Sequence, residues 1–380
     1  MKDGWKVLSL RNCCDILDSK RVPITKSKRE KGDVPYYGAT GLQDYVKDYL
    51  FDEPLVLLGE DGAKWGAGEN SAYKIDGKSW VNNHAHVLRP RRDLLKDEWL
   101  IYFLNYSDLQ GYITGVTVPK LNQEKMGTIS IPVPPLSDQQ SIVEYLDSSF
   151  AKIDAMKANA KKALNEGHKF LQESINFFLV PQENWIKKKL QELGESKVGP
   201  FGSLLHKSDY VLNGVPLINP MHISNGCINE DYSFSVNKDK YNELQSYIMQ
   251  EGDIVIGRRG EMGRCAVVRR EHSGFLCGTG SIFFRPNTKL VYPDFLQMLL
   301  SSKKIVALIT EVAGGATMLN LSSKGLNSIT VDIPSLSEQQ LIVSTVDSLK
   351  SKVDQLQSNY NQISKECDAL KQALLKQVFE

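Results

Sequence analysis

The feature that most constrains the fold of this chain is an internal repeat. Residues 136–147 read LSDQQSIVEYLD, and residues 336–347 read LSEQQLIVSTVD, with seven identities among twelve positions at an offset of 200 residues. Residues 5–10 are matched more loosely by residues 185–190, now at an offset of 180. Because the two offsets differ, the chain consists of two halves with a shared frame and middles of different length.

Each copy of the repeat is predicted to begin a long helix. After the second copy, apolar residues recur in alternating steps of three and four, the spacing of a coiled-coil seam. A helix of about 40 residues spans on the order of 60 Å. The two helices are expected to pair with each other, since the first seam also contains the small residues Ser149, Ala160, Ala163 and Gly167, which would let the larger seam residues of the second helix approach closely. The predicted seam residues are Leu146, Ile153 and Met156 in the first helix and Val346, Leu349, Val353, Leu356, Tyr360, Ile363, Leu370 and Leu374 in the second.

The segments outside the helices have strand and turn patterns. Short apolar runs such as 54–59 and 253–257 are bounded by glycines and Asp-Gly or Asn-Gly pairs, whereas residues 99–109 and 292–309 have helical periodicity. The predicted fold is therefore α+β, with two mixed α/β modules separated by two long antiparallel coiled-coil helices and related by a pseudo-two-fold duplication. The predicted divisions are a first module (1–135), a first helix (136–180), a second module (181–335) and a second helix (336–380).

The sequence contains no pattern typical of a catalytic site. A P-loop, a complete dinucleotide-binding glycine motif, a G-x-S-x-G turn and an H-E-x-x-H helix are all missing from it. His84 and His86 would lie on one face of a strand, but no third metal ligand is evident, and a hydrogen-bonding pair is the favoured interpretation. These observations favour a binding protein without a metal site.

Charge is balanced overall but clustered locally. The 380 residues carry 46 basic and 45 acidic side chains. Residues 20–31 contain six basic side chains opposed by Glu30 alone, and residues 258–270 contain five arginines opposed by Glu261 alone. Such clusters in glycine-containing turns suit contacts with phosphates or guanine edges, although a solvated surface is the alternative.

The sequence also predicts the compartment. No run approaches 18 apolar residues, and the first residues lack the apolar region of a signal peptide. We therefore expect a protein of the cytoplasm that does not contact a membrane.

The repeat and the module motifs together resemble a known family. Residues 131–143 follow the pattern I-P-x-P-P-L-x-x-Q-Q-x-I-V, and residues 331–343 follow it in degenerate form. The first module adds PYYGATG at 35–41 and WVNNHAHV at 80–87, and the second adds GDIVIGRRG at 252–260. Over essentially its full length, the chain resembles the specificity subunit of type I restriction–modification systems.

The resemblance implies a bacterial or archaeal DNA-binding subunit with no catalytic activity of its own. The modules would be target recognition domains, each reading one half of a bipartite, asymmetric sequence in double-stranded DNA, and the helices would fix the spacer. The partners would be two adenine-methylating modification subunits and ATP-dependent restriction subunits. S-adenosylmethionine, ATP and magnesium would belong to those partners, and this chain would hold no cofactor.

Charge and turn context nominate the DNA-contacting side chains. These are Lys26, Lys28, Arg29, Tyr37, Lys64, Asn83, His84 and His86 in the first module and Arg258, Arg259, Arg264, Ser281 and Arg285 in the second. Two other functions remain open from the residues: a structural coiled-coil adaptor, and a free-standing DNA-modifying enzyme with unrecognised motifs. DNA-independent behaviour would favour the adaptor, and methylation without a partner would favour the enzyme.

Overall fold

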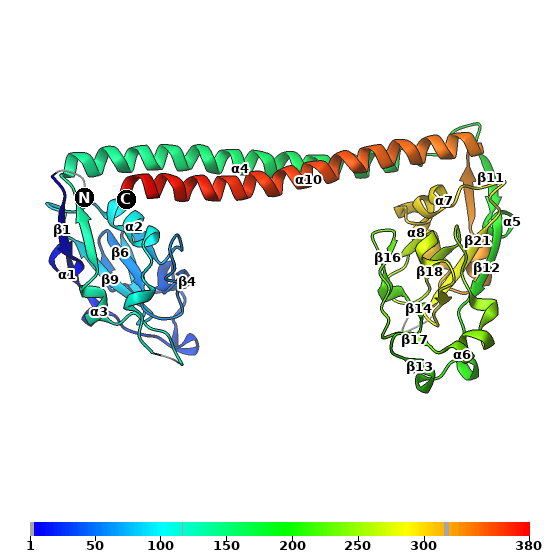
Figure 1. Cartoon of the computed structure of the whole chain (residues 1–380), viewed down its shortest axis with the longest axis horizontal. Helices are drawn as coiled ribbons and strands as arrows, with labels where there is room; N and C mark the ends of the chain where they lie inside the picture. Colours follow the sequence, from blue (N-terminus) through cyan, green and yellow to red (C-terminus); the bar gives the residue numbers. More distant parts are fainter. Residues whose placement is uncertain (1–3, 116, 315–318) are drawn as a thin grey trace. The chain divides into compact units, whose positions relative to one another are not determined.

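The computed structural model describes residues 4–115, 117–314 and 319–380 and divides into two compact units (Figure 1). Unit 1 comprises residues 1–163 and 358–380, and unit 2 comprises residues 164–357. Two long helices, α4 (Leu136–Phe178) and α10 (Leu336–Phe379), contribute residues to both units. Each unit therefore contains one module together with a segment of each long helix.

Unit 1 is built from short strands and a few short helices. The strands are β1 (Lys6–Ser9), β2 (Cys14–Ile16), β3 (Val34–Gly38), β4 (Gly41–Val46), β5 (Phe51–Asp52), β6 (Leu55–Gly59), β7 (Ala72–Ile75), β8 (Lys78–Val81), β9 (Ala85–Pro90) and β10 (Ser130–Val133). The short helices are α1 (Leu10–Cys13), α2 (Asp97–Tyr106) and α3 (Gln123–Gly127).

A central antiparallel sheet in the order β2-β9-β6-β7 divides the core of unit 1 into two layers. Strand β6 is buried on both faces, because Val56 and Leu58 point toward α2 and the long helices while Leu55 and Leu57 point toward the second sheet, β4-β3-β8-β5. The sequence of a strand that is buried on both faces is typically a continuous run of apolar residues, as in β6. Helix α2 packs through Trp99, which is fully buried and donates its indole N–H to the Pro132 carbonyl at 2.8 Å.

Unit 2 is built in the same way. Its strands are β11 (Ile186–Lys189), β12 (Gly194–Val198), β13 (Tyr210–Val211), β14 (Val215–Ile218), β15 (Ile223–Ser224), β16 (Cys227–Ile228), β17 (Ser235–Val236), β18 (Ile254–Gly257), β19 (Cys265–Val267), β20 (Leu276–Cys277), β21 (Ser281–Pro286) and β22 (Thr330–Ile333). Its short helices are α5 (Leu190–Leu193), α6 (Lys238–Glu243), α7 (Pro293–Leu300), α8 (Lys303–Val312) and α9 (Ser323–Ser328).

The sheets of unit 2 repeat those of unit 1. The central sheet β12-β21-β18-β19 corresponds strand for strand to β2-β9-β6-β7. The second sheets also correspond, since each contains a single parallel pair, β3 with β8 in unit 1 and β14 with β20 in unit 2. Strand β1 pairs with β10, as β11 pairs with β22, just before each long helix. The predicted fold class and the internal duplication are confirmed.

The long helices pack antiparallel within each unit. In unit 1, Lys157 Nζ lies 3.0 Å from Asp368 Oδ1, and Lys371 Nζ lies 2.6 Å from Asp154 Oδ1, so the numbering of the two helices runs in opposite directions. In unit 2, a Cβ added to Gly167 would approach Leu356 Cδ1 to 2.9 Å. The small residue at this position therefore brings the two helices close together.

The register of the seam differs from the predicted one in two places. Met156 and Leu370 were predicted to lie in the seam, but their side chains are 58% and 48% exposed. In α4 the half-buried Lys157 lies one residue after Met156 and the buried Leu164 one residue after Ala163, whereas Leu146 and Ile153 are buried as predicted. In α10 two successive steps of four residues separate Cys367, Lys371 and Leu375, which turns Leu370 outward.

The other predicted seam residues are buried or half-buried. They are Leu146, Ile153, Val346, Leu349, Val353, Leu356, Tyr360, Ile363 and Leu374. Across the part of the chain that the structure describes, no helix combines the length and the apolar composition needed to cross a bilayer.

Candidate nucleic-acid interface

A turn directly after buried strand β6 is held on both sides by backbone hydrogen bonds. The Glu60 N–H donates to the His84 carbonyl at 2.8 Å, and the Leu121 N–H donates to the Glu60 carbonyl at 2.8 Å. The next residue, Asp61, forms an isolated antiparallel bridge with Lys120. The turn is therefore fixed to two other loops of unit 1.

Unit 2 repeats this turn after buried strand β18, with the same bonds. The Arg258 N–H donates to the Gly280 carbonyl at 3.0 Å, and the Leu321 N–H donates to the Arg258 carbonyl at 2.9 Å. Arg259 bridges to Asn320 as Asp61 bridges to Lys120. We name these segments the β6 turn (residues 60–61) and the β18 turn (residues 258–259).

The inner residue of the β6 turn, Glu60, lies in a network of buried charges. Its carboxylate accepts a hydrogen bond from Lys120 Nζ at 2.6 Å and another from the Arg21 guanidinium. Burial by itself raises the pKa of Glu60, but the hydrogen bonds from Lys120 and Arg21 outweigh this effect and leave the pKa below its ordinary value. Arg21 also donates to the Ala85 carbonyl at 2.8 Å, which ties the network to the start of β9.

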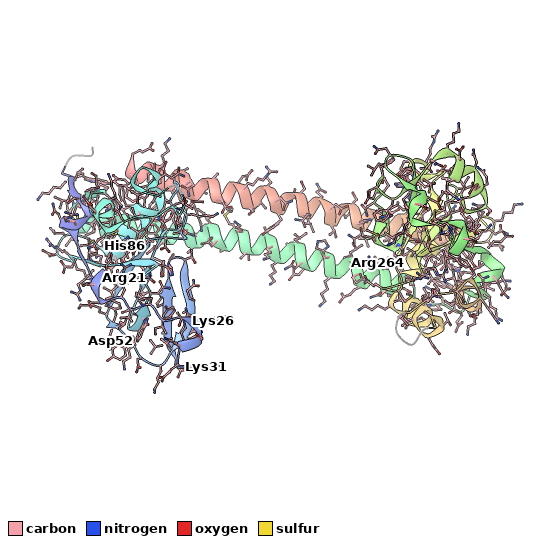
Figure 2. All side chains as sticks on the ribbon, turned by 90° about the horizontal axis from the view of Figure 1, so that it is seen from below. Arg21, Lys26, Lys31, Asp52, His86 and Arg264 are labelled. Atoms are coloured by element: carbon pink, nitrogen blue, oxygen red, sulfur yellow. The ribbon has the colours of Figure 1, made fainter. Side chains whose placement is uncertain are left out.

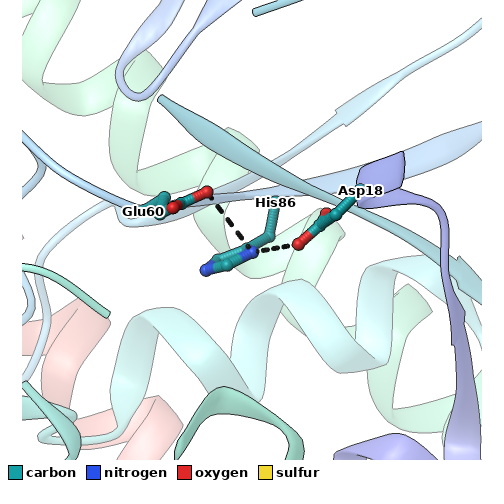
Figure 3. A group of neighbouring side chains, drawn as sticks. All are labelled: Asp18, Glu60 and His86. Atoms are coloured by element: carbon teal, nitrogen blue, oxygen red, sulfur yellow. Dashed lines mark hydrogen bonds and ion pairs between the residues drawn. The ribbon is translucent and has the colours of Figure 1, made fainter. Parts of the chain in front are cut away.

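His86 belongs to the same network (Figure 3). Its Nδ1 lies 2.6 Å from Asp18 Oδ2 and 3.7 Å from Glu60 Oε2, and its Nε2 lies 2.7 Å from the Leu121 carbonyl oxygen. Both ring nitrogens of His86 therefore face oxygen atoms, and the imidazole joins Asp18 and Glu60 to the segment that contains Leu121.

Asp18, Glu60 and His86 also have the chemistry of metal ligands, and their ligand atoms lie within 4.8 Å of one another. However, a metal needs a neutral imidazole with a free nitrogen lone pair, and here both ring nitrogens face acceptors. The guanidinium of Arg21 and the ammonium of Lys120 already supply the positive charge beside Glu60. The arrangement is that of an ion-pair network which positions the β6 turn.

The β18 turn carries the opposite charge. The inner residue, Arg258, is half-buried and donates from Nε to Asn320 Oδ1 at 3.1 Å and to the Leu321 carbonyl at 3.2 Å. Burial lowers the pKa of Arg258, and repulsion from Arg259 adds to this effect. The outer residue, Arg259, is exposed, and its side chain has no hydrogen-bond or ion-pair partner among the residues that the structure describes.

The remaining predicted residues of the first module fall into two groups. Lys26, Lys28, Lys64 and Asn83 are exposed, and Figure 2 shows Lys26 at the periphery of unit 1, near Lys31. The side chains of Arg29, Tyr37 and His84 instead contact other residues of unit 1. Arg29 pairs with Asp44 at 3.0 Å and lies over the Tyr36 ring. Tyr37 is half-buried against Tyr73, and burial raises the pKa of Tyr37. The exposed His84 contacts Asp61 through Nδ1.

In the second module the predicted residues are dispersed. Arg264 is exposed and pairs with Glu261, its Nε lying 2.8 Å from the carboxylate. Arg285 forms a bidentate pair with the buried Asp253, at 2.8 Å and 2.7 Å. Arg285 therefore serves an internal ion pair, and its prediction as a DNA contact remains untested.

Two of the predicted DNA contacts have buried side chains. The side chains of His86 and Ser281 are both inaccessible to solvent at 0% exposure, and His86 is bonded within the charge network. Both residues lie at the start of a strand whose first four residues are all buried, an environment that a choice based on charge and turns does not detect. Asp61 and Lys120, which form a bridge beside the β6 turn, were not among the predicted residues, although the 200-residue offset of the repeat also relates Lys120 to Asn320.

Comparisons with known proteins agree with this architecture. A family model described as the type I restriction modification DNA specificity domain matches residues 2–166 and again residues 182–365. A Haemophilus influenzae protein assigned as a type I restriction enzyme specificity subunit is 27% identical over 91% of this chain and 87% of its own length. The specificity subunit of the Escherichia coli type I restriction enzyme EcoBI is 22% identical over 99% of this chain and 86% of its own length.

Two solved structures share the fold. One comes from a study of complex assembly and conformational transition in a type I restriction–modification system; it has a TM-score of 0.70 at 17% identity and covers 100% of this chain and 98% of its own. The other is the HsdS subunit from Thermoanaerobacter tengcongensis, with a TM-score of 0.61 at 16% identity and coverage of 100% and 97%.

Proposed function

The chain belongs to the type I restriction–modification DNA specificity family, and from this premise we propose that it reads a bipartite, asymmetric sequence in double-stranded DNA, one half-site per module. The observation that carries the proposal is the duplicated scaffold whose equivalent turns differ in charge. The β6 and β18 turns share their backbone bonds, yet one carries Glu60 and Asp61 and the other carries Arg258 and Arg259. Two copies of one module with different side chains at the same turn suit two different half-sites.

In this proposal the two long helices hold the modules and set the spacer between the half-sites. Joining two modules on one chain makes the second half-site contact intramolecular, so two modest affinities combine into a high one. The resulting subunit would also carry two adenine-methylating modification subunits, which in turn associate with ATP-dependent restriction subunits. S-adenosylmethionine, ATP and magnesium would bind to those subunits, and the present chain would act without catalysis.

Adenine-methylation mapping tests the proposal. Cells that contain the matching modification subunit are compared with and without this chain, and we expect a gapped methylated motif that appears only with the chain. Exchange of the second module for that of another specificity subunit provides the matched control and should change one half-site only. Methylation that does not depend on the chain would refute the proposal and favour an adaptor role.

A further inference from the structure

We propose that the β6 and β18 turns are base-reading positions and that they recognise base edges of opposite hydrogen-bonding polarity. Asp61 would accept a hydrogen bond from the amino group of a cytosine or an adenine, and Arg259 would donate to a guanine. This inference rests on the proposed DNA-reading function and adds to it the residues and the base chemistry.

The two turns occupy the same place in their modules. Each follows the last glycine of a strand buried on both faces, Gly59 in β6 and Gly257 in β18. These glycines accept no side chain without a clash or a close contact: an added Cβ would lie 2.3 Å from Ala63 Cβ and 3.2 Å from Pro220 Cβ, respectively. Together with the shared backbone bonds, this packing gives each turn a fixed position from which a side chain can project.

Arg259 has the accessibility and the chemistry to read guanine. It is exposed and has no ion-pair partner within the described residues, whereas its neighbour Arg258 is held inward by Asn320. The position that corresponds to His84 beside the β6 turn is Gly280, so the side chain that flanks the first turn has no counterpart in the second. The planar guanidinium matches guanine O6 and N7 in the major groove.

Asp61 offers the complementary chemistry. Its carboxylate only accepts hydrogen bonds, and its negative charge excludes a favourable contact with a phosphate. The side chain is 21% exposed, and His84 Nδ1 holds it from one side. A carboxylate fixed in this way pairs with the amino group that cytosine N4 or adenine N6 presents in the major groove.

Base analogues in the target test the proposal directly. Once methylation mapping gives the target, binding of the full chain with its modification subunits is measured on duplexes that carry one altered base. One series replaces single guanines of the second half-site by 7-deazaguanine, which lacks the N7 acceptor. The other replaces single adenines or cytosines of the first half-site by nebularine or 2-pyrimidinone, which lack the amino group.

For the wild-type chain we expect one position in each series to lose about 5- to 150-fold in affinity, the size of a good base contact. Arg259→Ala should bind the natural target more weakly and be insensitive to the decisive 7-deazaguanine. Asp61→Ala should likewise be insensitive to the decisive missing amino group. Lys289→Ala and Asp52→Ala are matched controls, because both residues are exposed and lie outside the two turns and outside the basic clusters at 20–31 and 258–270.

Each variant should still discriminate at the half-site that it does not contact, which shows that the protein remains folded. If Arg259→Ala weakens all sequences alike, Arg259 contacts a phosphate and its part of the proposal is overturned. The part that concerns Asp61 is overturned if Asp61→Ala remains sensitive to every missing amino group. A motif that requires the chain but is unchanged in both variants refutes this inference alone, whereas a motif that does not require the chain refutes the proposed function.

Discussion

Gln139 and Gln339 occupy equivalent positions in the first turns of α4 and α10 and make the same three hydrogen bonds. Both side chains are fully buried. Gln139 Oε1 accepts from the Lys96 N–H at 2.9 Å, and Gln139 Nε2 donates to the carbonyls of Leu94 and Pro134, both at 2.8 Å. The amide therefore joins the start of α4 to the loop before α2.

Gln339 repeats this arrangement in unit 2. Its Oε1 accepts from the Tyr292 N–H at 2.7 Å, and its Nε2 donates to Leu290 and Pro334 at 3.2 Å and 2.9 Å. Three backbone groups thus depend on one buried amide in each half, and a polar group that loses its partner on burial costs free energy. This dependence accounts for the glutamine that recurs at positions 139 and 339 of the repeat.

Replacement of Gln339 by leucine is expected to lower the free energy of unfolding by about 1–3 kcal/mol, because the Tyr292 N–H and two carbonyls would lose their partner. Urea denaturation of the full chain measures the change. The adjacent Gln340 is exposed, so Gln340→Leu is the matched control and should change stability by less than about 0.5 kcal/mol. Equal effects of the two substitutions would contradict the role assigned to Gln339.

Much of the fold was predictable because local sequence patterns determine where its helices and strands begin and end. The repeat located the starts of both long helices, and the apolar runs at 54–59 and 253–257 correspond to β6 and β18. The periodicity of residues 292–309 predicted a single helix. The structure has two helices there, α7 and α8, and Ser302 caps α8 by accepting a hydrogen bond from the Ile305 N–H. Patterns of this kind involve residues that are close in the sequence, so they can be recognised without knowledge of the tertiary contacts.

The candidate site was less predictable because its residues meet only in the folded module. Local charge selected Lys26 and Arg259, which are exposed, but it also selected His86, which is buried. The network around Glu60 joins loops that lie far apart in the sequence, with Arg21 at one end and Lys120 at the other. No local sequence pattern indicates such a contact, and the equivalence of the β6 and β18 turns follows only from the backbone hydrogen bonds that they share in the folded protein.

The phase of the helix seam can be tested by a pair of alanine substitutions in α4. Ile153 is buried at 4% exposure and Met156 is exposed at 58%. Ile153→Ala is expected to cost about 2–5 kcal/mol of unfolding free energy, as for other large-to-small changes in a core. Met156→Ala should lie within about 0.5 kcal/mol of the parent, measured by urea denaturation of the full chain. A loss at Met156 as large as the loss at Ile153 would place Met156 in the seam, as predicted from the sequence.

The charge network predicts a pH dependence that Glu60→Gln removes. Hydrogen bonds hold the pKa of Glu60 below its ordinary value of 4.5, so the unfolded chain binds a proton at Glu60 more readily than the folded chain. The stabilisation from the carboxylate is therefore complete above pH 4.5 and is lost as the pH falls through the folded-state pKa.

The corresponding measurement is the difference in unfolding free energy between the parent and Glu60→Gln across this range. We expect the difference to be largest at neutral pH and to shrink on acidification. Glu124 is exposed, so Glu124→Gln is the control and should give a small difference that does not vary with pH. A difference for Glu60→Gln that stays constant down to about pH 3 would show that the network does not depend on the ionised carboxylate.

Substitution of Arg285 tests whether this side chain forms a structural ion pair or contacts DNA. It forms a bidentate pair with Asp253, whose side chain is 2% exposed, much as Arg89 pairs with Glu53 in the first module. Arg285→Ala would leave the Asp253 carboxylate buried with fewer hydrogen bonds, so we expect a loss of about 1–3 kcal/mol in unfolding free energy. The exposed Arg270 provides the control, and Arg270→Ala should have little effect on stability.

Methylation mapping with Arg285→Ala should give an unchanged second half-site. If the variant instead keeps its stability and relaxes one base of that half-site, Arg285 reads DNA as the sequence predicted.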